Sequence, residues 1–222
     1  LPQIIEQVEK CGEEYEILVV DTEQPLDHTA DVCERFGARY VNQEQPGFGG
    51  AFRTAIKYAK KDKFLILDSD GSHPPKNIQD LHRMFASGRY DVVIGSRYVK
   101  GGRTDDAKSS IIMSHMLNFA FRVCLGISAK DISTDYRMYY TKQLKQVELT
   151  CVNYDVLQEV LLKLKLNKED HRLRIGEAPI YFQKRLYGES KRQLAKFIIS
   201  YMKTITRLTW MRITHARRSA GA

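Results

Sequence analysis

The sequence predicts an α/β fold in which a mostly parallel sheet carries helices on both faces. Residues 64–67 (FLIL) and 91–95 (DVVIG) are short apolar runs without helical spacing, as expected of strands buried on both faces. Segments with helical spacing lie between such runs, and this alternation is typical of a parallel sheet. The chain has 222 residues, of which 43% are apolar, so it is long enough for one sizeable core and short for two.

The remaining elements follow from the same periodicities and from stop signals. Strands are expected at residues 16–20, 39–42, 64–67, 91–95 and 177–182. Helices are expected at residues 1–10, 27–37, 51–60, 77–87, 111–125 and 157–166. Gly37 and Gly126 each follow the last apolar position of a helix and stop it. The glycine-rich run at 46–50 opens a helix without matching the P-loop, and a close strand–helix contact explains it equally well.

Cysteine and hydropathy patterns exclude several classes of protein. The four cysteines are widely spaced and include no C-x-x-C pair, so we expect free thiols in a reducing compartment rather than a zinc site or a disulfide framework. We find no run of 18 uncharged apolar residues and no signal peptide, so we expect the chain neither to span a bilayer nor to be secreted by itself. Association with a membrane surface stays open.

Positive charge is concentrated near the C-terminus. The formal net charge is +8, yet residues 184–218 contain ten Lys and Arg against the single acid Glu189, which leaves the rest of the chain near −1. A basic tail on an otherwise nearly neutral body predicts an anionic partner, a lipid surface before a nucleic acid.

Two carboxylates stand directly after the apolar run at 64–67. Asp68 and Asp70 flank the small Ser69, and ligands of open α/β sheets bind at the carboxyl ends of the strands. Carboxylates there are suitable oxygen ligands for Mg²⁺ or Mn²⁺ carrying a diphosphate. A solvated turn is the competing explanation of Asp-x-Asp-Gly by itself. Arg97 follows the strand at 91–95 and is therefore expected at the same edge.

Several motifs together resemble a known family. They are EILVVD, PGFGGAFRTAI, LDSDGSHPP, DVVIGSRYVKGG, DISTDYRMYY, GEAPIYF and RLYGESK, in this order. The set resembles the family 2 glycosyltransferases of the GT-A (Rossmann-like) fold, and within them the dolichol- or polyprenyl-phosphate mannosyl- and glucosyltransferases. The resemblance extends from Leu1 to about Lys196, and the set is far more specific than any one motif.

The resemblance implies a metal-dependent, inverting hexosyltransferase that uses GDP-mannose or UDP-glucose and a polyprenyl or dolichyl phosphate. Matching positions imply roles for individual residues. The implied metal ligands for Mg²⁺ or Mn²⁺ are Asp68 and Asp70, and the implied contacts of the nucleotide sugar are Asp21, Asp68, Ser69 and Asp70. The implied acceptor site consists of Arg97, Ser114, Asn118, Arg185 and Lys191, and the implied catalytic residues are Asp70, Arg97, Arg185 and Lys191. Glu159 matches an acceptor-side glutamate, although a satisfied carboxylate on a partly buried helix explains it as well.

The sequence departs from the family pattern at three places. The family's first strand, with its Pro-x-x-Asn-Glu run, is missing ahead of residue 1 and is expected to lie centrally in the sheet. Ser72 stands where close relatives have an amide, and it is a weaker ligand. Ser110 stands where an arginine is usual, although Lys108 can substitute as a point charge.

The chemistry of the acceptor decides whether a base is needed. A phosphomonoester is anionic at neutral pH and attacks the sugar without a base. A sugar hydroxyl, as in polysaccharide synthesis, needs one, and Asp131 or Asp135 is the candidate.

Three classes of protein compete with a glycosyltransferase and have weaker support from the sequence. They are a nucleotidyltransferase that forms sugar nucleotides, a catalytically inactive membrane-docked scaffold and an RNA-binding protein. A nucleotidyltransferase ordinarily starts with a glycine-rich loop bearing Arg and Lys, which is not found. An RNA-binding protein of the RRM class has an aromatic run that is not found either. Metal-dependent release of a nucleoside diphosphate distinguishes the enzyme from the scaffold.

We therefore expect a catalytic domain over residues 1–194 and a basic amphipathic helix over 195–222. In the tail, apolar residues recur at three- and four-residue steps beside Lys and Arg, a pattern of helices that lie on membranes. A helix packed on its own domain or on a partner subunit is the alternative. The expected location is peripheral, on the cytoplasmic side of a membrane. A membrane-anchoring subunit or a second copy of the chain is a further candidate partner, and nucleic acid is not expected.

Overall fold

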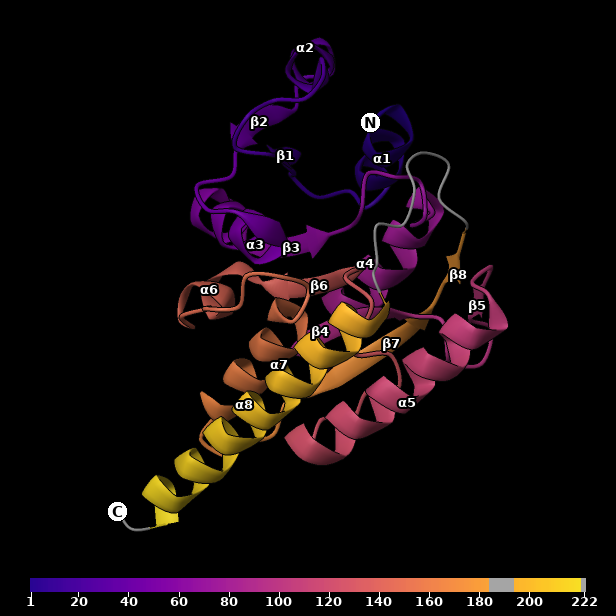
Figure 1. Ribbon diagram of the computed structural model, residues 1–222. Coiled ribbons are helices and arrows are strands. Elements are labelled where there is room, and N and C mark those ends of the chain that lie inside the picture. The colour runs from indigo at the N-terminus through magenta and orange to yellow at the C-terminus, as the bar shows by residue number, and fades with distance from the viewer. Residues whose placement is uncertain (184–193, 221–222) are drawn as a thin grey trace.

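The computed structural model describes residues 1–183 and 194–220, and Figure 1 shows their arrangement. In chain order the elements are α1 (Pro2–Glu9), β1 (Leu18–Asp21), α2 (Thr29–Arg35), β2 (Arg39–Asn42), α3 (Gly47–Tyr58), β3 (Lys63–Ile66), the 3₁₀ turn η1 (Pro75–Asn77), α4 (Ile78–Ala86), β4 (Val92–Ser96), β5 (Arg103–Thr104), α5 (Lys108–Leu125), β6 (Arg137–Tyr140), α6 (Thr141–Lys145), α7 (Val156–Leu166), β7 (Ile175–Pro179), β8 (Tyr181–Phe182) and α8 (Leu194–Ala220).

The central sheet has the order β3-β6-β4-β7 and is mixed rather than mostly parallel. Strand β4 runs parallel to β7, but β6 lies antiparallel between β3 and β4. The α/β class is confirmed, and the prediction of a mostly parallel sheet is wrong for this described sheet. The cause is β6, for which the sequence predicts no element because its residues, RMYY, are polar and aromatic rather than aliphatic.

Helices cover both faces of the central sheet, as predicted. Alternate residues of β4 point to opposite sides, so Val92 and Ile94 enter one core cluster while Val93 enters the other. The larger cluster joins the sheet to α3, α5, α7 and α8, and the smaller one joins it to α4 and α1. The site residues at the strand ends therefore rest on a sheet buried on both faces.

Strands β1 and β2 pair in parallel with each other and, among the described residues, with no strand of the central sheet. Figure 1 shows them at the α3 side of the molecule, beyond β3. The prediction that a further strand lies centrally in the sheet is not tested by this arrangement and stays a prediction.

The C-terminal helix α8 packs against α5 and α7 (Figure 1). Tyr201, Ile205 and Leu208 are buried in the larger core cluster. Arg207 contacts the Cys151 sulfur and the Thr150 hydroxyl. One face of this helix therefore belongs to the domain, which was the alternative to a purely membrane-facing tail. No described helix combines the length and apolar character required to cross a bilayer, and all four cysteines are free thiols.

Candidate active site

The acidic motif forms a turn directly after β3. Gly71 has a φ of 83°, a conformation that glycine adopts without strain, and it lets the chain reverse toward η1. The Ser72 N–H donates to Asp70 Oδ1 at 2.9 Å, which fixes this turn from within. Asp68 and Asp70 are partly buried and Ser69 is exposed, while Ser72 is fully buried with its hydroxyl unpaired among the described residues.

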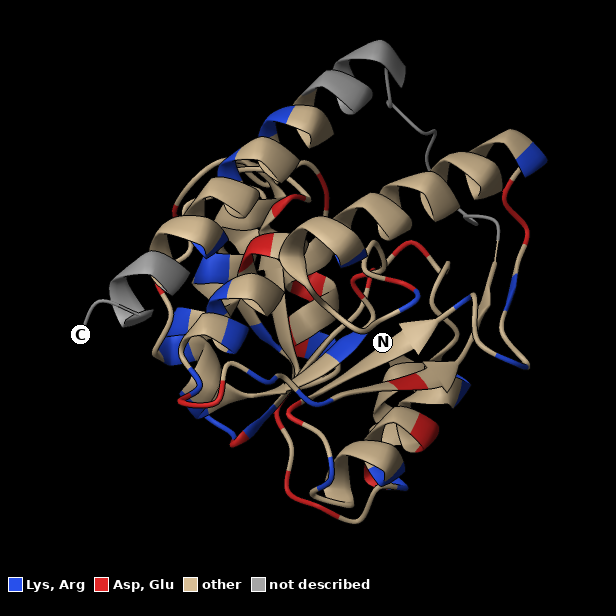
Figure 2. Cartoon of the chain, turned by 90° about the horizontal axis from the view of Figure 1, so that it is seen from below, with Lys and Arg blue, Asp and Glu red and all other residues tan. Residues whose placement is uncertain are grey.

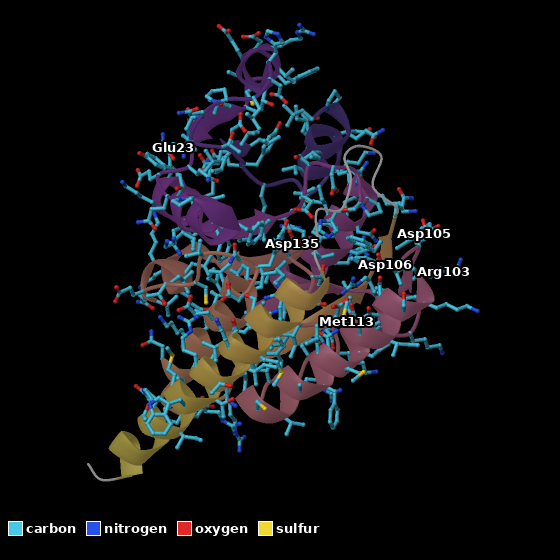
Figure 3. The ribbon with its side chains drawn as sticks, in the orientation of Figure 1. Glu23, Arg103, Asp105, Asp106, Met113 and Asp135 are labelled. Atoms are coloured by element: carbon cyan, nitrogen blue, oxygen red, sulfur yellow. The ribbon has the colours of Figure 1, made fainter. Side chains whose placement is uncertain are left out.

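Asp68 lies beside His73 and Asp135, and possible ligand atoms of the three side chains lie within 4.8 Å of one another. His73 and Asp135 are 1% and 5% exposed. Asp135 precedes β6, and Figure 3 shows it in the middle of the molecule, near β3 of the central sheet. The strand that sequence patterns missed thus delivers the second carboxylate of the cluster.

His73 is held in one orientation. The Asp68 N–H donates to His73 Nδ1 at 3.0 Å, and the ring stacks on Tyr136 with centroids 4.8 Å apart. Burial lowers the pKa of His73 to about 4, so the ring is neutral at pH 7. Because Nδ1 accepts a hydrogen bond, the proton of the neutral ring is assigned to Nε2, which lies 3.4 Å from Asp135 Oδ1.

The two carboxylates are electrostatically coupled. Burial, followed by the neighbouring Asp135, raises the pKa of Asp68 to about 8, and burial also raises the pKa of Asp135. Asp135 Oδ2 is buried without a hydrogen-bond partner among the described residues. Two close acids, one of them with a buried unpaired oxygen, need either a shared proton or a cation. The donor set of carboxylate oxygens fits a hard divalent ion such as Mg²⁺ or Mn²⁺.

Arg97 follows β4 and is engaged by acids. Its Nε donates to Asp131 Oδ2 at 2.8 Å and its Nη2 to Asp131 Oδ1 at 2.9 Å, a bidentate pair, while Nη1 donates to Asp106 Oδ2 at 3.3 Å. Only 9% of the Arg97 side chain is exposed. Burial alone would raise the pKa of Asp131, but the bonds from Arg97 outweigh it and lower that pKa. Asp131 is thereby a poor general base, which leaves Asp135 as the remaining candidate.

The segment 130–137 is anchored from several sides. Glu177 accepts the N–H groups of Lys130 and Asp131 at 2.9 and 3.1 Å. Arg137 is fully buried and donates to the carbonyls of Thr134, Leu157 and Ile132. These bonds fix the backbone on both sides of Asp135. No role was assigned to Arg137 or His73 from the sequence. For Arg137 a signal was available, because a charged residue stands directly beside an aromatic run.

The other predicted site residues lie in different surroundings. Asp21, at the end of β1, accepts hydrogen bonds from the Tyr40 hydroxyl at 2.8 Å and the Thr22 N–H at 2.7 Å, and it is not one of the three residues of the Asp68 cluster. Ser114 is partly buried on α5. Asn118, on the same helix, is 2% exposed and its Oδ1 accepts the Ile132 N–H at 3.0 Å, so it holds the segment 130–137. Arg185 and Lys191 lie outside the described residues.

Glu159 is a satisfied structural carboxylate. It is fully buried on α7 and accepts the N–H groups of Thr150 and Cys151 at 2.9 and 2.8 Å and the Thr150 hydroxyl at 2.8 Å. Burial alone would raise the pKa of Glu159, but these donors and Lys163 lower it to about 2. The structure favours this explanation over an acceptor-side role.

Comparisons with known proteins agree with the sequence resemblance. The profile of "Glycosyl transferase family 2" matches residues 1–147. A dolichol-phosphate mannosyltransferase of Pyrococcus furiosus is 30% identical over 210 residues, which are 89% of this chain and 56% of that protein. An undecaprenyl-phosphate mannosyltransferase of Micrococcus luteus is 29% identical over 86% of this chain and 81% of its own length. The chain thus spans little more than half of the archaeal relative.

Solved structures support the fold. Glucosyl-3-phosphoglycerate synthase from Mycobacterium tuberculosis, in complex with Mn²⁺, UDP-glucose and phosphoglyceric acid, superposes with a TM-score of 0.66 at 18% identity, over 93% of this chain and 74% of that one. At this identity the likeness shows the GT-A fold alone. The family match over residues 1–147 establishes that this chain belongs to glycosyl transferase family 2.

Proposed function

We propose that this chain is the catalytic domain of a metal-dependent, inverting hexosyltransferase that transfers a sugar from a nucleotide sugar of the GDP-mannose or UDP-glucose type to a polyprenyl or dolichyl phosphate. The observation that carries the proposal is the close carboxylate pair of the partly buried Asp68 and the buried Asp135 beside the Asp70 turn, at the carboxyl end of β3. The relatives named for dolichol-phosphate and undecaprenyl-phosphate mannosyl transfer support the acceptor class.

The reaction requires positioning and charge rather than a base. One oxygen of the acceptor phosphate forms a bond to the sugar C1 as the bond from C1 to the nucleoside diphosphate breaks, and a single displacement inverts C1. A bound divalent ion supplies charge that offsets the departing diphosphate. Asp68 and Asp70 would hold that ion: the Ser72 N–H fixes the Asp70 carboxylate, and the bond from the Asp68 N–H to His73 fixes the backbone at Asp68. Arg185 and Lys191 stay predicted as the cations that bring the two anions together.

Arg97 has a different part in this proposal from the one that the resemblance implies. Because its guanidinium donates to Asp131, Asp106 and the Ser133 hydroxyl, its charge is largely neutralised within the protein. We assign it to positioning: the ion pair with Asp131 fixes the start of the segment that carries Asp135.

An exposed apolar surface supports attachment to a membrane. Helices α5 and α8 lie side by side (Figure 1). Their outward apolar side chains, 42 to 68% exposed, are Ile112, Met116, Phe119 and Val123 on α5 and Met202, Trp210 and Ile213 on α8. Figure 2 shows α5 with little charge beyond its start. Lys108 and Arg122 on α5 and Lys203 on α8 are exposed on the same two helices. We propose that it rests on an anionic leaflet, on the cytoplasmic side, where a lipid-linked acceptor is found.

A screen of nucleotides tests the donor half of the proposal. Thermal unfolding of the full chain is followed with GDP, UDP, GDP-mannose and UDP-glucose, each with Mn²⁺ or with EDTA. We expect one nucleotide pair to raise the melting temperature with Mn²⁺ and to lose most of that shift in EDTA, since ligands that bind only the folded state stabilise it. No shift with any nucleotide would contradict the proposal and favour the inactive scaffold. Shifts that are equal in EDTA would contradict only its metal dependence.

A sugar hydroxyl is the second candidate acceptor. Asp135 favours it, because a carboxylate with a raised pKa is a better general base than an ordinary one. A hydroxyl acceptor predicts that turnover rises with pH as a carboxylate ionises, whereas a phosphate acceptor predicts dependence on the second ionisation of the phosphate.

A further inference from the structure

Three carboxylates converge near the turn after β3, and one of them is not part of the Asp-x-Asp motif. Asp135 comes from the segment before β6, 67 positions beyond Asp68 in the chain, and reaches the same few ångströms. Its Oδ2 is buried and makes no hydrogen bond to any described residue, which is costly for a carboxylate unless something else binds it. If the chain binds a divalent ion, as the proposed function requires, this oxygen is available to complete the ion's coordination.

His73 is the other candidate ligand, and its hydrogen bond argues against it. Its Nδ1 lone pair accepts the Asp68 N–H at 3.0 Å and is therefore occupied. The neutral ring then carries its proton on Nε2, which has no lone pair left for a metal. That Nε2 is buried, makes no hydrogen bond to a described residue and lies 3.4 Å from Asp135 Oδ1. His73 is thus placed as a donor that faces a carboxylate, which is the usual relation of an outer-shell group to a metal ligand.

The remaining contacts of Asp135 suit a ligand. Neighbouring residues fix the position of Asp135. The Arg137 side chain, two residues after it, donates to three backbone carbonyls, and Asn118 accepts the N–H of Ile132, three residues before it. Tyr136 stacks on His73, which locks the ring against the carboxylate. A carboxylate on an anchored backbone, with one oxygen facing a ring N–H and the other unpaired among the described residues, is arranged to bind a cation with little reorganisation.

We infer that Asp135 is a third carboxylate ligand of the divalent ion, and that His73 is a positioning residue that orients Asp135 rather than a ligand itself. The site then takes oxygens from two separate segments, the turn after β3 and the approach to β6. Binding of the ion draws these segments together and relieves the contact between Asp68 and Asp135.

Binding of Mn²⁺ alone tests this inference without any turnover. Free Mn²⁺ is measured by electron paramagnetic resonance during titration of the full chain, with and without GDP or UDP. Asp135→Asn keeps the shape but removes the charged ligand, and we expect its Kd for Mn²⁺ to rise at least about tenfold. Asp105→Asn is the matched control, because Asp105 lies on the β5–α5 connection, away from Asp135 (Figure 3), and its Kd should equal that of the wild type.

His73→Gln separates the two roles of the histidine. The glutamine amide nitrogen can replace the Nε2 donor, whereas the neutral amide oxygen is a weaker ligand for Mn²⁺ than an imidazole nitrogen. A positioning role therefore predicts a Kd within about threefold of the wild type, and a ligand role predicts a clear rise in Kd. Metal-free melting temperatures confirm that each variant is folded. Asp135→Asn should melt close to the wild type, because it replaces a buried acid by a neutral group of the same shape, and should lose the stabilisation by Mn²⁺.

The outcomes are distinguishable. Wild-type affinity in Asp135→Asn would overturn Asp135 as a ligand while leaving the proposed function intact. A loss in His73→Gln as large as that in Asp135→Asn would place His73 among the ligands and overturn its positioning role. Absence of Mn²⁺ binding by the wild type, even with GDP and UDP, would overturn this inference together with the proposed metal-dependent function.

Discussion

Replacing Arg97 by alanine is expected to destabilise the fold rather than to remove a diphosphate contact. The Asp131 side chain has no exposed area, and the substitution removes both of its bonds from the guanidinium. Of the described donors to this carboxylate, the backbone N–H at position 97 and the Ser133 hydroxyl remain. Breaking a buried ion pair by removing one partner costs about 3–5 kcal/mol. For a chain of 222 residues this corresponds to a fall in melting temperature of roughly 6–20 °C.

The assay combines urea denaturation with nucleotide binding. Arg97→Ala should lower the free energy of unfolding by the amount given above, and Arg97→Lys should fall between it and the wild type, since lysine keeps the charge but not the bidentate geometry. The double variant Arg97→Met with Asp131→Leu should recover much of the loss, because no charge is then left buried alone. An Arg97→Ala protein as stable as the wild type that no longer binds nucleotide would refute this reasoning and assign Arg97 to the diphosphate.

Three further predictions concern the acids and the exposed helix. Asp70→Asn should abolish sugar transfer in a radiolabel assay while circular dichroism shows an intact fold; wild-type turnover with Mn²⁺ would count against Asp70 as a ligand. Glu159 has a folded-state pKa of about 2 against an ordinary value of 4.5, so its stabilisation is present above pH 4.5 and is lost as the pH falls toward 2. Glu159→Gln should therefore show a flatter acid-unfolding curve, by up to about 3 kcal/mol, and an unchanged curve would exclude this role. Phe119→Glu should weaken co-sedimentation with anionic liposomes, whereas Gln24→Glu, the same charge change at an exposed position near β1, should not; equal binding by both would remove α5 from the membrane surface.

Local patterns were sufficient for the aliphatic strands but not for β6. The apolar runs before Asp68 and before Ser96 became β3 and β4 with shifts of about one residue at their ends. Strand β6 contains a fully buried arginine and two tyrosines, and its stability comes from partners distant in sequence: β3 and β4 on either side and the carbonyls that Arg137 reaches. Such tertiary compensation leaves no periodic signal, so both the strand and its antiparallel direction were missed.

Only part of the candidate site could be predicted, because the rest depends on contacts between segments that are distant in the sequence. Asp68 and Asp70 stand two residues apart after an apolar run, so a local motif reveals them. The contact of Asp68 with Asp135 arises only once β6 inserts between β3 and β4, and His73 acquires its role through a backbone hydrogen bond. Arg97 was predicted to bind the acceptor. Its motif does not reveal that the guanidinium instead donates to Asp131 and Asp106 within the protein.

The most direct test of the proposed activity is transfer of radiolabelled sugar to lipid. The full chain is incubated with GDP-[¹⁴C]mannose or UDP-[¹⁴C]glucose and a polyprenyl phosphate in anionic vesicles, with Mn²⁺ or with EDTA, and label is measured in the organic extract. We predict that one donor labels the lipid with Mn²⁺, and that the label is absent with EDTA and without the polyprenyl phosphate. No lipid label from either donor, under conditions where a nucleotide stabilises the folded chain, would contradict a polyprenyl phosphate acceptor.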